Sequence, residues 1–357
     1  MHSSTDDHAQ ADLPPDALLS VVVPVFNEEE VLNELHSRLS GVLTSIASRW
    51  EVVYVNDGSS DRTIELLTEL RRSDDRVAVV DLSRNFGKEI AMTAGLDVSR
   101  GDAVVVIDAD LQDPPELISE FVKYWREGFD VVYAKRTRRE GEGWVKRATA
   151  HLFYRVIGSL SEVKIPADTG DYRLLSRRAV DALKRVREKH RFMKGLFAWI
   201  GYRQKEILYS RKPRFAGKTK WSYWRLWNFA LEGITSFTSA PLKIAMYVGI
   251  AIALGALVYA VQVIYDTLAH GNPVAGYPSL MVVILMLGGV QLIAVGLIGE
   301  YLARVFDESK SRPLYLVKSF LPSKDGNADA ESPLGTTTLG VALHPVSASR
   351  ADPASPG

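Results

Sequence analysis

Three aspartates follow an apolar run in the stretch VVVIDADLQDPPE, residues 104–116. The run is typical of a strand inside a sheet, so Asp108, Asp110 and Asp113 stand where a buried strand ends. Burying carboxylates there is costly unless a cation or a proton offsets their charge. Alternating side-chain directions allow Asp108 and Asp110 to flank one point. Hard divalent ions prefer oxygen ligands and often share them with phosphate oxygens, so we predict a metal–diphosphate site here.

The two polar neighbours of this pair suggest different roles. Gln112 offers a carbonyl oxygen on the same loop and is the candidate third metal ligand. Asp113 precedes two prolines, a pattern that favours a helix N-cap followed by proline in the first turn. We therefore predict a mainly structural role for Asp113. An Asp-x-Asp pair alone has low specificity, because chance matches are common and capping is their usual explanation.

The chain around these aspartates alternates between strand-like and helical segments from residue 19 to 134. This alternation predicts a parallel sheet covered by helices on both faces, which binds ligands at the carboxyl ends of its strands. Asp57 ends the second predicted strand, and with Pro24 of the first strand it forms a candidate pocket for a base and a ribose. Neither a G-x-G-x-x-G after the first strand nor a P-loop motif is present.

The composition excludes several classes of protein. Lys and Arg number 43, as do Asp and Glu, so a globally basic nucleic-acid binder is not indicated. The chain has no cysteine, which excludes disulfide scaffolds, thiolate zinc sites and cysteine nucleophiles. The N-terminal residues are polar and acidic and lack the basic start and apolar stretch of a secretory signal. We expect the N-terminal part to stay in the cytoplasm.

Two apolar runs, 244–261 and 279–299, each approach the roughly 20 residues that cross a bilayer. Lys and Arg flank only the outer ends of the pair, and the connecting DTLAHGNPVAGYP has neither. The positive-inside bias then places both termini in the cytoplasm. Buried core helices are the alternative. We predict a two-pass protein of the cytoplasmic (inner) membrane, with spans at about 242–264 and 279–300 and a cytoplasmic body.

Six motifs occur in a fixed order along the chain: VVVPVFNEEE, VNDGSSDRT, DLSRNFGKEIAMTAGLD, DADLQDPPE, DTGDYRLLSR and RFAGKTKWS. In this order they resemble family 2 glycosyltransferases of the GT-A fold. More narrowly, they resemble polyprenyl-phosphate glycosyltransferases, which include dolichol-phosphate mannose synthases and bactoprenol glucosyltransferases. The resemblance covers about residues 18–310. It implies an α/β fold: a Rossmann-like, mostly parallel GT-A domain in the cytoplasm, with interfacial helices and a two-helix transmembrane hairpin.

The expected organisation has five parts: a disordered N-terminus (1–17), the GT-A domain (18–220), an interfacial helix (221–240), the two transmembrane helices (241–305) and a largely disordered cytoplasmic tail (306–357).

The resemblance also implies roles for individual residues. The nucleotide pocket is lined by Pro24, Glu28 and Asp57. Mg²⁺ or Mn²⁺ is held by Asp108, Asp110 and Gln112. The segments that the family uses to bind the acceptor phosphate contain Arg136, Arg147, Arg211, Arg214 and Lys220. Each of these cations alone could instead meet anionic lipid headgroups.

Asp171 resembles the residue that acts as catalytic base, with Asp168 as a close rival. A lipid phosphate is already ionised at neutral pH, so Asp171 can instead orient the sugar or the acceptor. A third alternative is a capping carboxylate before the helix expected at Arg177.

The implied reaction is a metal-dependent, inverting transfer of a hexose from a nucleotide sugar to polyprenyl (undecaprenyl) phosphate. UDP-glucose is the first choice of donor, and GDP-mannose and aminoarabinose-type donors remain open. The resemblance suggests a homotetramer at the lipid bilayer and no nucleic-acid partner. A membrane polysaccharide synthase is an alternative, but no Q-x-x-R-W motif appears. A non-catalytic scaffold would be marked by loss of the paired aspartates, and both are present.

Overall fold

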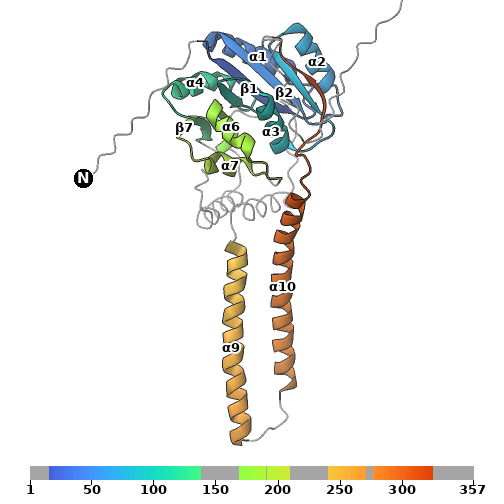
Figure 1. Ribbon diagram of the computed structural model, residues 1–357, viewed down its shortest axis with the longest axis vertical. Coiled ribbons are helices and arrows are strands. Elements are labelled where there is room, and N and C mark those ends of the chain that lie inside the picture. The colour runs from blue at the N-terminus through green and yellow to red at the C-terminus, as the bar shows by residue number, and fades with distance from the viewer. Residues whose placement is uncertain (1–15, 138–168, 190, 210–239, 271–275, 325–357) are drawn as a thin grey trace, which may run out of the picture.

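The computed structural model describes residues 16–137, 169–189, 191–209, 240–270 and 276–324 (Figure 1). Its strands are β1 Leu18–Val25, β2 Arg49–Asn56, β3 Val77–Leu82, β4 Ala103–Val106, β5 Val131–Arg136, β6 Thr169–Ser176, β7 Gln204–Tyr209 and β8 Val317–Leu321. Its helices are α1 Leu32–Ile46, α2 Thr63–Ser73, α3 Lys88–Val98, the 3₁₀ turn η1 Pro115–Leu117, α4 Ile118–Arg126, α6 Arg177–Arg185, α7 Met193–Trp199, α9 Ala240–His270 and α10 Tyr277–Ser309.

The strands form one eight-stranded sheet in the order β7-β5-β6-β4-β1-β2-β3-β8. Strands β4, β1, β2 and β3 are parallel neighbours, as the alternating pattern predicts. The other half differs, because β6 enters between β4 and β5 and is antiparallel to both. Strand β6 comes from the motif DTGDYRLLSR, whose Asp171 is thereby placed beside the strand that precedes Asp108.

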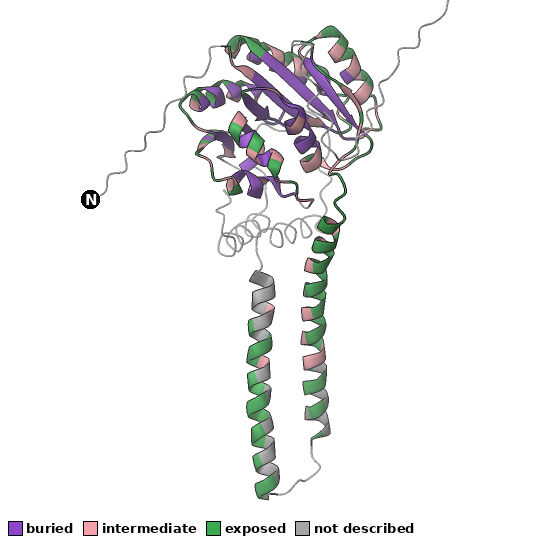
Figure 2. Cartoon of the chain, viewed as in Figure 1, coloured by how far each residue is buried: buried purple, intermediate pink, exposed green. Residues whose placement is uncertain are grey.

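Helices cover both faces of the sheet, and each face has its own apolar core (Figure 2). Successive residues of β1 point to opposite cores: Val21 and Val23 pack on the face of α1, α2 and α4, and Val22 packs on the face of α3. This period of two is the reason that β1 reads as a continuous apolar run. The polar site therefore has to lie at the ends of the strands.

Gly95 of α3 sits directly against the sheet. A Cβ at this position would lie 2.3 Å from Val22 Cγ1 and 3.0 Å from Val55 Cγ2. We expect Gly95→Ala to lower the free energy of unfolding by about 1–3 kcal/mol, the usual effect of overpacking. The matched control is Gly41→Ala in α1, where a Cβ meets nothing within 4 Å and alanine favours the helix. Denaturant unfolding of both variants tests the difference. Equal stability of the two would contradict this packing.

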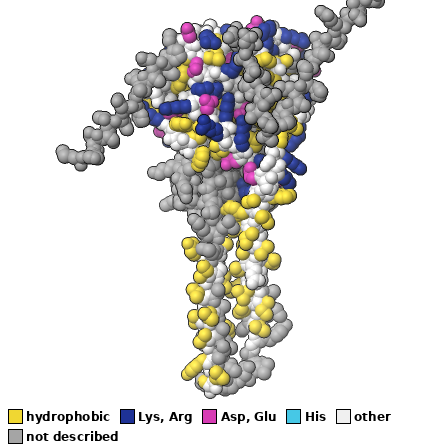
Figure 3. Space-filling view, viewed as in Figure 1, with side chains coloured by type: hydrophobic (Ala, Val, Ile, Leu, Met, Phe, Trp, Pro, Cys, Tyr) yellow, Lys and Arg dark blue, Asp and Glu magenta, His cyan; other side chains and the backbone are white. Residues whose placement is uncertain are grey.

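Helices α9 and α10 leave the α/β body on the same side and contact each other (Figure 1). The apolar side chains described on these two helices are mostly exposed (Figure 3), and Leu292 and Ile293 are each 74% exposed. In the described chain, one segment, Met286–Ser309, is long and apolar enough to cross a bilayer. The corresponding stretch of α9, Gly249–Tyr259, is shorter, so the two-span hairpin stays a prediction.

After α10 the chain returns to the body. Strand β8 pairs antiparallel with β3 at the edge of the sheet. The end of α10 is also held, because the backbone N–H of Lys189 donates to Glu308 at 2.6 Å. Within the expected tail from residue 306, the end of α10 and residues 317–321 are therefore ordered, and the largely disordered tail stays a prediction for the rest. Residues 1–15, the proposed interfacial helix up to residue 239, and 325–357 lie outside the described residues.

Candidate active site

The candidate site lies at the carboxyl ends of the parallel strands, where a sheet of this topology binds its ligands. Asp57 follows β2, and Asp108 and Asp110 follow β4. Strand β6 runs antiparallel beside β4, and its first half therefore reaches the same edge. This arrangement brings Asp171 to Asp108 although 63 positions separate them in the sequence.

Lys88, the first residue of α3, joins the two aspartates. Its Nζ lies 2.6 Å from Asp108 Oδ1 and donates to Asp171 Oδ2 at 2.5 Å. The Asp108 contact is an ion pair without hydrogen-bond geometry, and both Asp108 Oδ1 and Asp171 Oδ1 are buried without a hydrogen-bond donor. The Lys88 side chain as a whole is 42% exposed, whereas that of Asp171 is 10% exposed.

Further cations surround Asp171. Burial alone would raise the pKa of Asp171, but the ammonium groups of Lys88 and Lys194 outweigh it and hold the pKa well below its usual range. Partial desolvation would lower the pKa of Lys88, but Asp108 and Asp171 raise it above its ordinary value. Burial lowers the pKa of Arg173 to about 10, and its guanidinium stacks 3.7 Å from the Phe197 ring centre. At neutral pH these groups are charged.

Glu89 differs from the other carboxylates of the site. Burial, followed by the negative charge of Asp171, raises its pKa to about 8. Its Oε2 atom is buried and has no hydrogen-bond partner. Glu89 is therefore largely protonated at neutral pH, and it adds no negative charge beside Asp171.

Glu89→Gln should flatten the pH dependence of stability. The pKa of Glu89 is raised on folding, from an ordinary value near 4.5 to about 8, so between these values the folded state holds a proton that the unfolded state has lost. The free energy of unfolding then falls as pH rises through this window, by at most about 1.4 kcal/mol per pH unit. Thermal unfolding from pH 5 to 8 measures the slope. The control is Glu65→Gln on the exposed face of α2; identical slopes in wild type and Glu89→Gln would contradict the assignment.

Asp57 fixes the loop that leads into α3. Its carboxylate accepts hydrogen bonds from the backbone N–H groups of Phe86 and Gly87 at 2.7 and 2.9 Å. Gly58 has φ +65°, and a Cβ there would lie 2.4 Å from the Arg84 carbonyl carbon, so only glycine allows this close approach. The Asp-Gly turn thus positions Lys88. The predicted nucleotide-binding role of Asp57 stays a prediction.

The loop after Asp108 corrects one expectation. Asp113 does not cap a helix: η1 has Pro114 as its N-cap residue, without a side-chain cap bond, and the buried Asp113 carboxylate accepts a hydrogen bond from the Tyr209 hydroxyl. Asp110 is half-buried and its Oδ1 accepts the backbone N–H of Gln112 at 3.1 Å. Gln112 is 9% exposed. Ligation by Gln112 stays a prediction.

The structure also places the other predicted residues where it describes them. Pro24 is half-buried in β1 opposite Val55, and Glu28 follows β1 on the loop to α1. Asp171 lies inside β6 and is no helix cap, because Ser176 caps α6 by accepting the Ala179 N–H. The backbone of Arg136 ends β5. The residues outside the described part of the chain are Asp168, Arg147, Arg211, Arg214 and Lys220.

Lys88 is the site residue that the sequence analysis missed. It lies in the motif DLSRNFGKEIAMTAGLD, directly after a glycine and at the start of a helix. That position could have indicated a functional role, because the helix dipole disfavours a lysine in the first turn of a helix.

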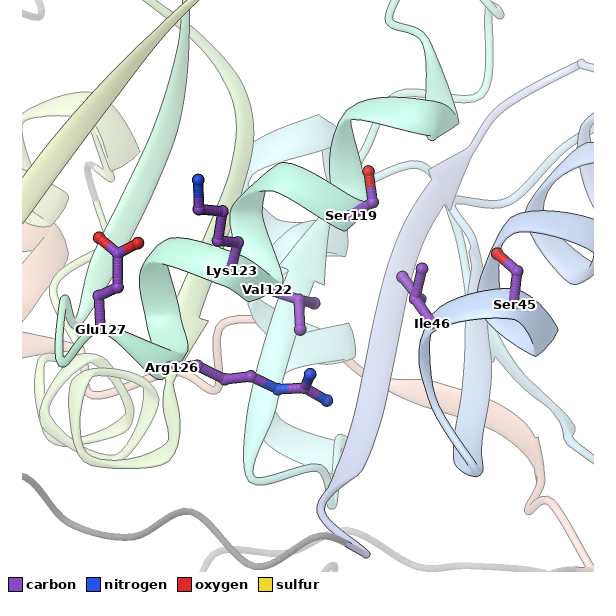
Figure 4. A pocket seen from close by; sticks show the side chains of 7 residues that line it. All are labelled: Ser45, Ile46, Ser119, Val122, Lys123, Arg126 and Glu127. Atoms are coloured by element: carbon purple, nitrogen blue, oxygen red, sulfur yellow. The ribbon is translucent and has the colours of Figure 1, made fainter.

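A shallow hollow of about 430 Å³ lies between α1 and α4 and is lined by Ser45, Ile46, Ser119, Val122, Lys123, Arg126 and Glu127 (Figure 4). Ser45 and Ile46 lie at the end of α1, and Arg126 ends α4. Helices that follow parallel strands run back along the sheet, so these ends lie toward the edge opposite the carboxylates. The hollow is not part of the site.

Known proteins share both parts of this architecture. The family model described as glycosyl transferase family 2 matches residues 20–184, from β1 to α6, and the one described as the GtrB C-terminal hairpin matches residues 240–305. A glycosyltransferase of Synechocystis is 57% identical over 84% of this chain and 94% of its own length. The bactoprenol glucosyl transferase of Shigella phage SfX is 46% identical over 84% of this chain and 99% of its own length.

Among solved structures, the glucosyl-3-phosphoglycerate synthase of Mycobacterium tuberculosis is 19% identical, with a TM-score of 0.42 over 61% of this chain and 78% of its own. The identity to full-length relatives extends over the sheet, the acidic site and the paired helices alike. The chain is a glycosyltransferase and belongs to glycosyl transferase family 2.

Proposed function

We propose that this enzyme transfers a hexose, glucose from UDP-glucose as first choice, to polyprenyl phosphate at the cytoplasmic face of the membrane. The observation that carries the proposal is the joined cluster at the strand ends, in which Lys88 links Asp108 of the Asp-x-Asp pair to Asp171. The bactoprenol glucosyl transferases that share 46% identity support the lipid acceptor and the glucosyl donor. GDP-mannose and aminoarabinose-type donors, and polysaccharide synthesis, are the competing possibilities.

The residues present fit a divalent cation. Asp108 and Asp110 both follow β4 and are half-buried, so their carboxylates offer the hard oxygen ligands that suit Mg²⁺ or Mn²⁺ shared with substrate phosphates. Asp108 and Asp110 would hold the ion, with Gln112 as the further ligand, and the Asp108 carboxylate already faces one cation, the Lys88 ammonium at 2.6 Å. The ion would supply positive charge that stabilises the negative charge of the departing diphosphate.

The proposed reaction balances without a proton. A non-bridging oxygen of the acceptor phosphate forms a bond to the anomeric carbon, and the bond from that carbon to the diphosphate oxygen breaks. The electron pair leaves with UDP, which gains the negative charge that the acceptor phosphate loses. A single in-line displacement of this kind inverts the anomeric centre. Asp171, ionised at neutral pH, would orient the sugar or the acceptor.

The exposed apolar helices support a location of the reaction at the membrane surface. Water-exposed apolar surfaces of this extent mark membrane or protein contacts. We propose that α9 and α10 are the two spans, which keeps the site near phosphates at the bilayer surface. Pro24, Glu28 and Asp57 would receive the nucleotide, and Arg136, Arg147, Arg211, Arg214 and Lys220 the acceptor phosphate. A homotetramer and a cell-envelope role are further parts of the proposal.

The test uses the full-length protein in detergent with undecaprenyl phosphate, Mn²⁺ and a panel of radiolabelled nucleotide sugars. We expect label from UDP-glucose to enter the organic phase in amounts that depend on the metal. Omission of the lipid phosphate is the control. If no donor delivers label to the lipid, the proposed function is wrong. If only GDP-mannose delivers label, the enzyme transfers mannose and UDP-glucose is not its donor.

A further inference from the structure

We infer that Lys88 is a catalytic residue that binds the attacking phosphate of the lipid acceptor, between the donor half of the site and Asp171. This inference rests on the proposed function and names a part of the site that motif resemblance does not assign. It follows from three observations: the contacts of the Lys88 ammonium, its exposure, and the charges around it.

The first observation is an incomplete set of contacts. An ammonium group has three N–H donors. Within the described residues, the Lys88 ammonium contacts two groups, the carboxylates of Asp108 and Asp171, at 2.6 and 2.5 Å. The contact with Asp108 lacks hydrogen-bond geometry. Two carboxylates engage at most two of the three N–H donors in this geometry, so the third is the one that we assign to a ligand; the side chain as a whole is 42% exposed.

The second observation is the position of Lys88 between the two halves of the reaction. The diphosphate of the donor lies, by the proposed function, against Asp108 and Asp110. The attacking oxygen must approach the anomeric carbon from the side opposite this leaving group. Lys88 touches Asp108 on one side and Asp171 of β6 on the other, so its ammonium stands where the two reactants meet.

The third observation is electrostatic. An ionised phosphate that enters this edge meets Asp108, Asp110 and Asp171, and like charges at short range oppose its approach. A cation between the carboxylates and the phosphate removes this penalty. Lys194 and Arg173 are also cationic, but Arg173 is 4% exposed and donates to the Gly170 carbonyl at 2.8 Å, and Lys194 is half-buried. Lys88 is the most exposed of these three cations.

The backbone around Lys88 is built to hold it in place. Asp57 fixes the Phe86 and Gly87 amides, and the close approach of Gly58 to Arg84 leaves the loop little freedom. A residue that only balanced two carboxylates would not require such a rigid approach. Placing one N–H within reach of a phosphate oxygen does require it, because a misplacement of about 1 Å reduces rates strongly.

The experiment compares Lys88→Gln and Lys88→Arg with wild type, in the full-length protein. Steady-state transfer is measured with undecaprenyl phosphate and UDP-glucose varied in turn, and the Kd of farnesyl phosphate and of UDP with Mn²⁺ is measured by calorimetry. We expect Lys88→Gln to lower kcat/KM for the acceptor by about 10- to 100-fold, the value of one charge-assisted hydrogen bond. The Kd of UDP should change less than about two-fold. Lys88→Arg, which keeps the charge, should recover part of the loss.

Lys123→Met on α4, at the opposite edge of the sheet, is the matched control for loss of a lysine. If Lys88→Gln lowers kcat/KM equally for UDP-glucose and for undecaprenyl phosphate, or lowers neither, the inference is overturned. A purely structural ion pair would affect the use of both substrates alike. Should Lys88→Gln fail to fold, the double variant Lys88→Gln/Asp108→Asn restores charge balance. Its Kd for farnesyl phosphate should be about 10-fold weaker than that of Asp108→Asn alone, and equal values would overturn the inference.

The two proposals fail in different ways. If wild type transfers no sugar to a polyprenyl phosphate, the proposed function fails and the role of Lys88 fails with it. If wild type transfers sugar and the Lys88 variants keep their acceptor kcat/KM, only the role of Lys88 is wrong.

Discussion

Asp171→Asn is expected to lower the transfer rate by about 100-fold or more, at saturating donor and acceptor. Losing the group that orients a reactant typically lowers rates by about 10², because a misplacement of about 1 Å is enough to do so. In this site the change also leaves Lys88 with Asp108 as its one carboxylate partner among the described residues, and it removes the carboxylate that most raises the pKa of Lys194. The substitution keeps the shape of the side chain, so lost charge is its main consequence.

The measurement is lipid-linked product formed per enzyme, with the melting temperature as a folding check. Asp181→Asn on α6 is the matched control, because Asp181 is 52% exposed and its ion pair with Arg177, at 3.4 Å, lies within one helix. If the activity of Asp171→Asn stays within a few-fold of wild type, Asp171 has no catalytic role.

Stability gives a second, independent signature of Asp171. Its pKa lies below the ordinary value in the folded state, so its ionised form contributes stability above an unfolded pKa near 3.9, and this contribution disappears as pH falls. The melting temperature of Asp171→Asn should therefore lie furthest below wild type near neutral pH. The difference should shrink below about pH 4. A difference that is constant with pH would contradict the ionised state.

The parallel half of the fold could be predicted from the sequence because its signals are local. Each of β1, β2 and β4 is an apolar run followed by polar residues, and strand ends in a parallel sheet share one edge. This rule was sufficient to place Asp57, Asp108 and Asp110 at the same edge. It required no knowledge of which strands are neighbours.

The antiparallel half could not be predicted in this way. Strand β6 contains Asp171 and Arg173 among its apolar residues, so its pattern is weak. Its position between β4 and β5 depends on pairing across 67–73 positions to β4 and across 34–44 positions to β5. The same holds for Asp113: two prolines give a local capping signal, but the carboxylate bonds to Tyr209, 96 positions away. Strand β8 has five residues, exposed at the sheet edge, and it too is specified by tertiary contacts.

The ion pair between Lys88 and Asp171 shows why the motifs alone did not predict all residues of the site. Each residue lies in a recognisable segment, but 83 positions separate them, and their ion pair exists only after α3 has packed on the sheet and β6 has paired with β4. The motifs indicate which segments matter. The contacts between segments decide which side chain acts.

Asp110→Asn should abolish metal-dependent transfer while leaving the fold intact. The asparagine oxygen can still accept the Gln112 N–H, and the Lys88–Asp108–Asp171 connection does not include Asp110. The loss is therefore one negative charge at the proposed metal. We expect the rate to fall by about 10²–10³, comparable to the removal of one electrostatic stabiliser of a transition state.

The measurement titrates Mn²⁺ and Mg²⁺ against transfer and, separately, against melting temperature in the presence of UDP. Ligands that bind only the folded state raise the melting temperature, so wild type should gain stability from metal with UDP and Asp110→Asn should gain little. Asp102→Asn, at the opposite end of β4, is the control, since its oxygen can still accept the Leu18 N–H. If Asp110→Asn keeps both the metal response and the rate of wild type, the cation is not held by the Asp-x-Asp pair. Loss of the melting response together with the rate is the expected result, and it would support Asp110 as a ligand of the metal that carries the diphosphate.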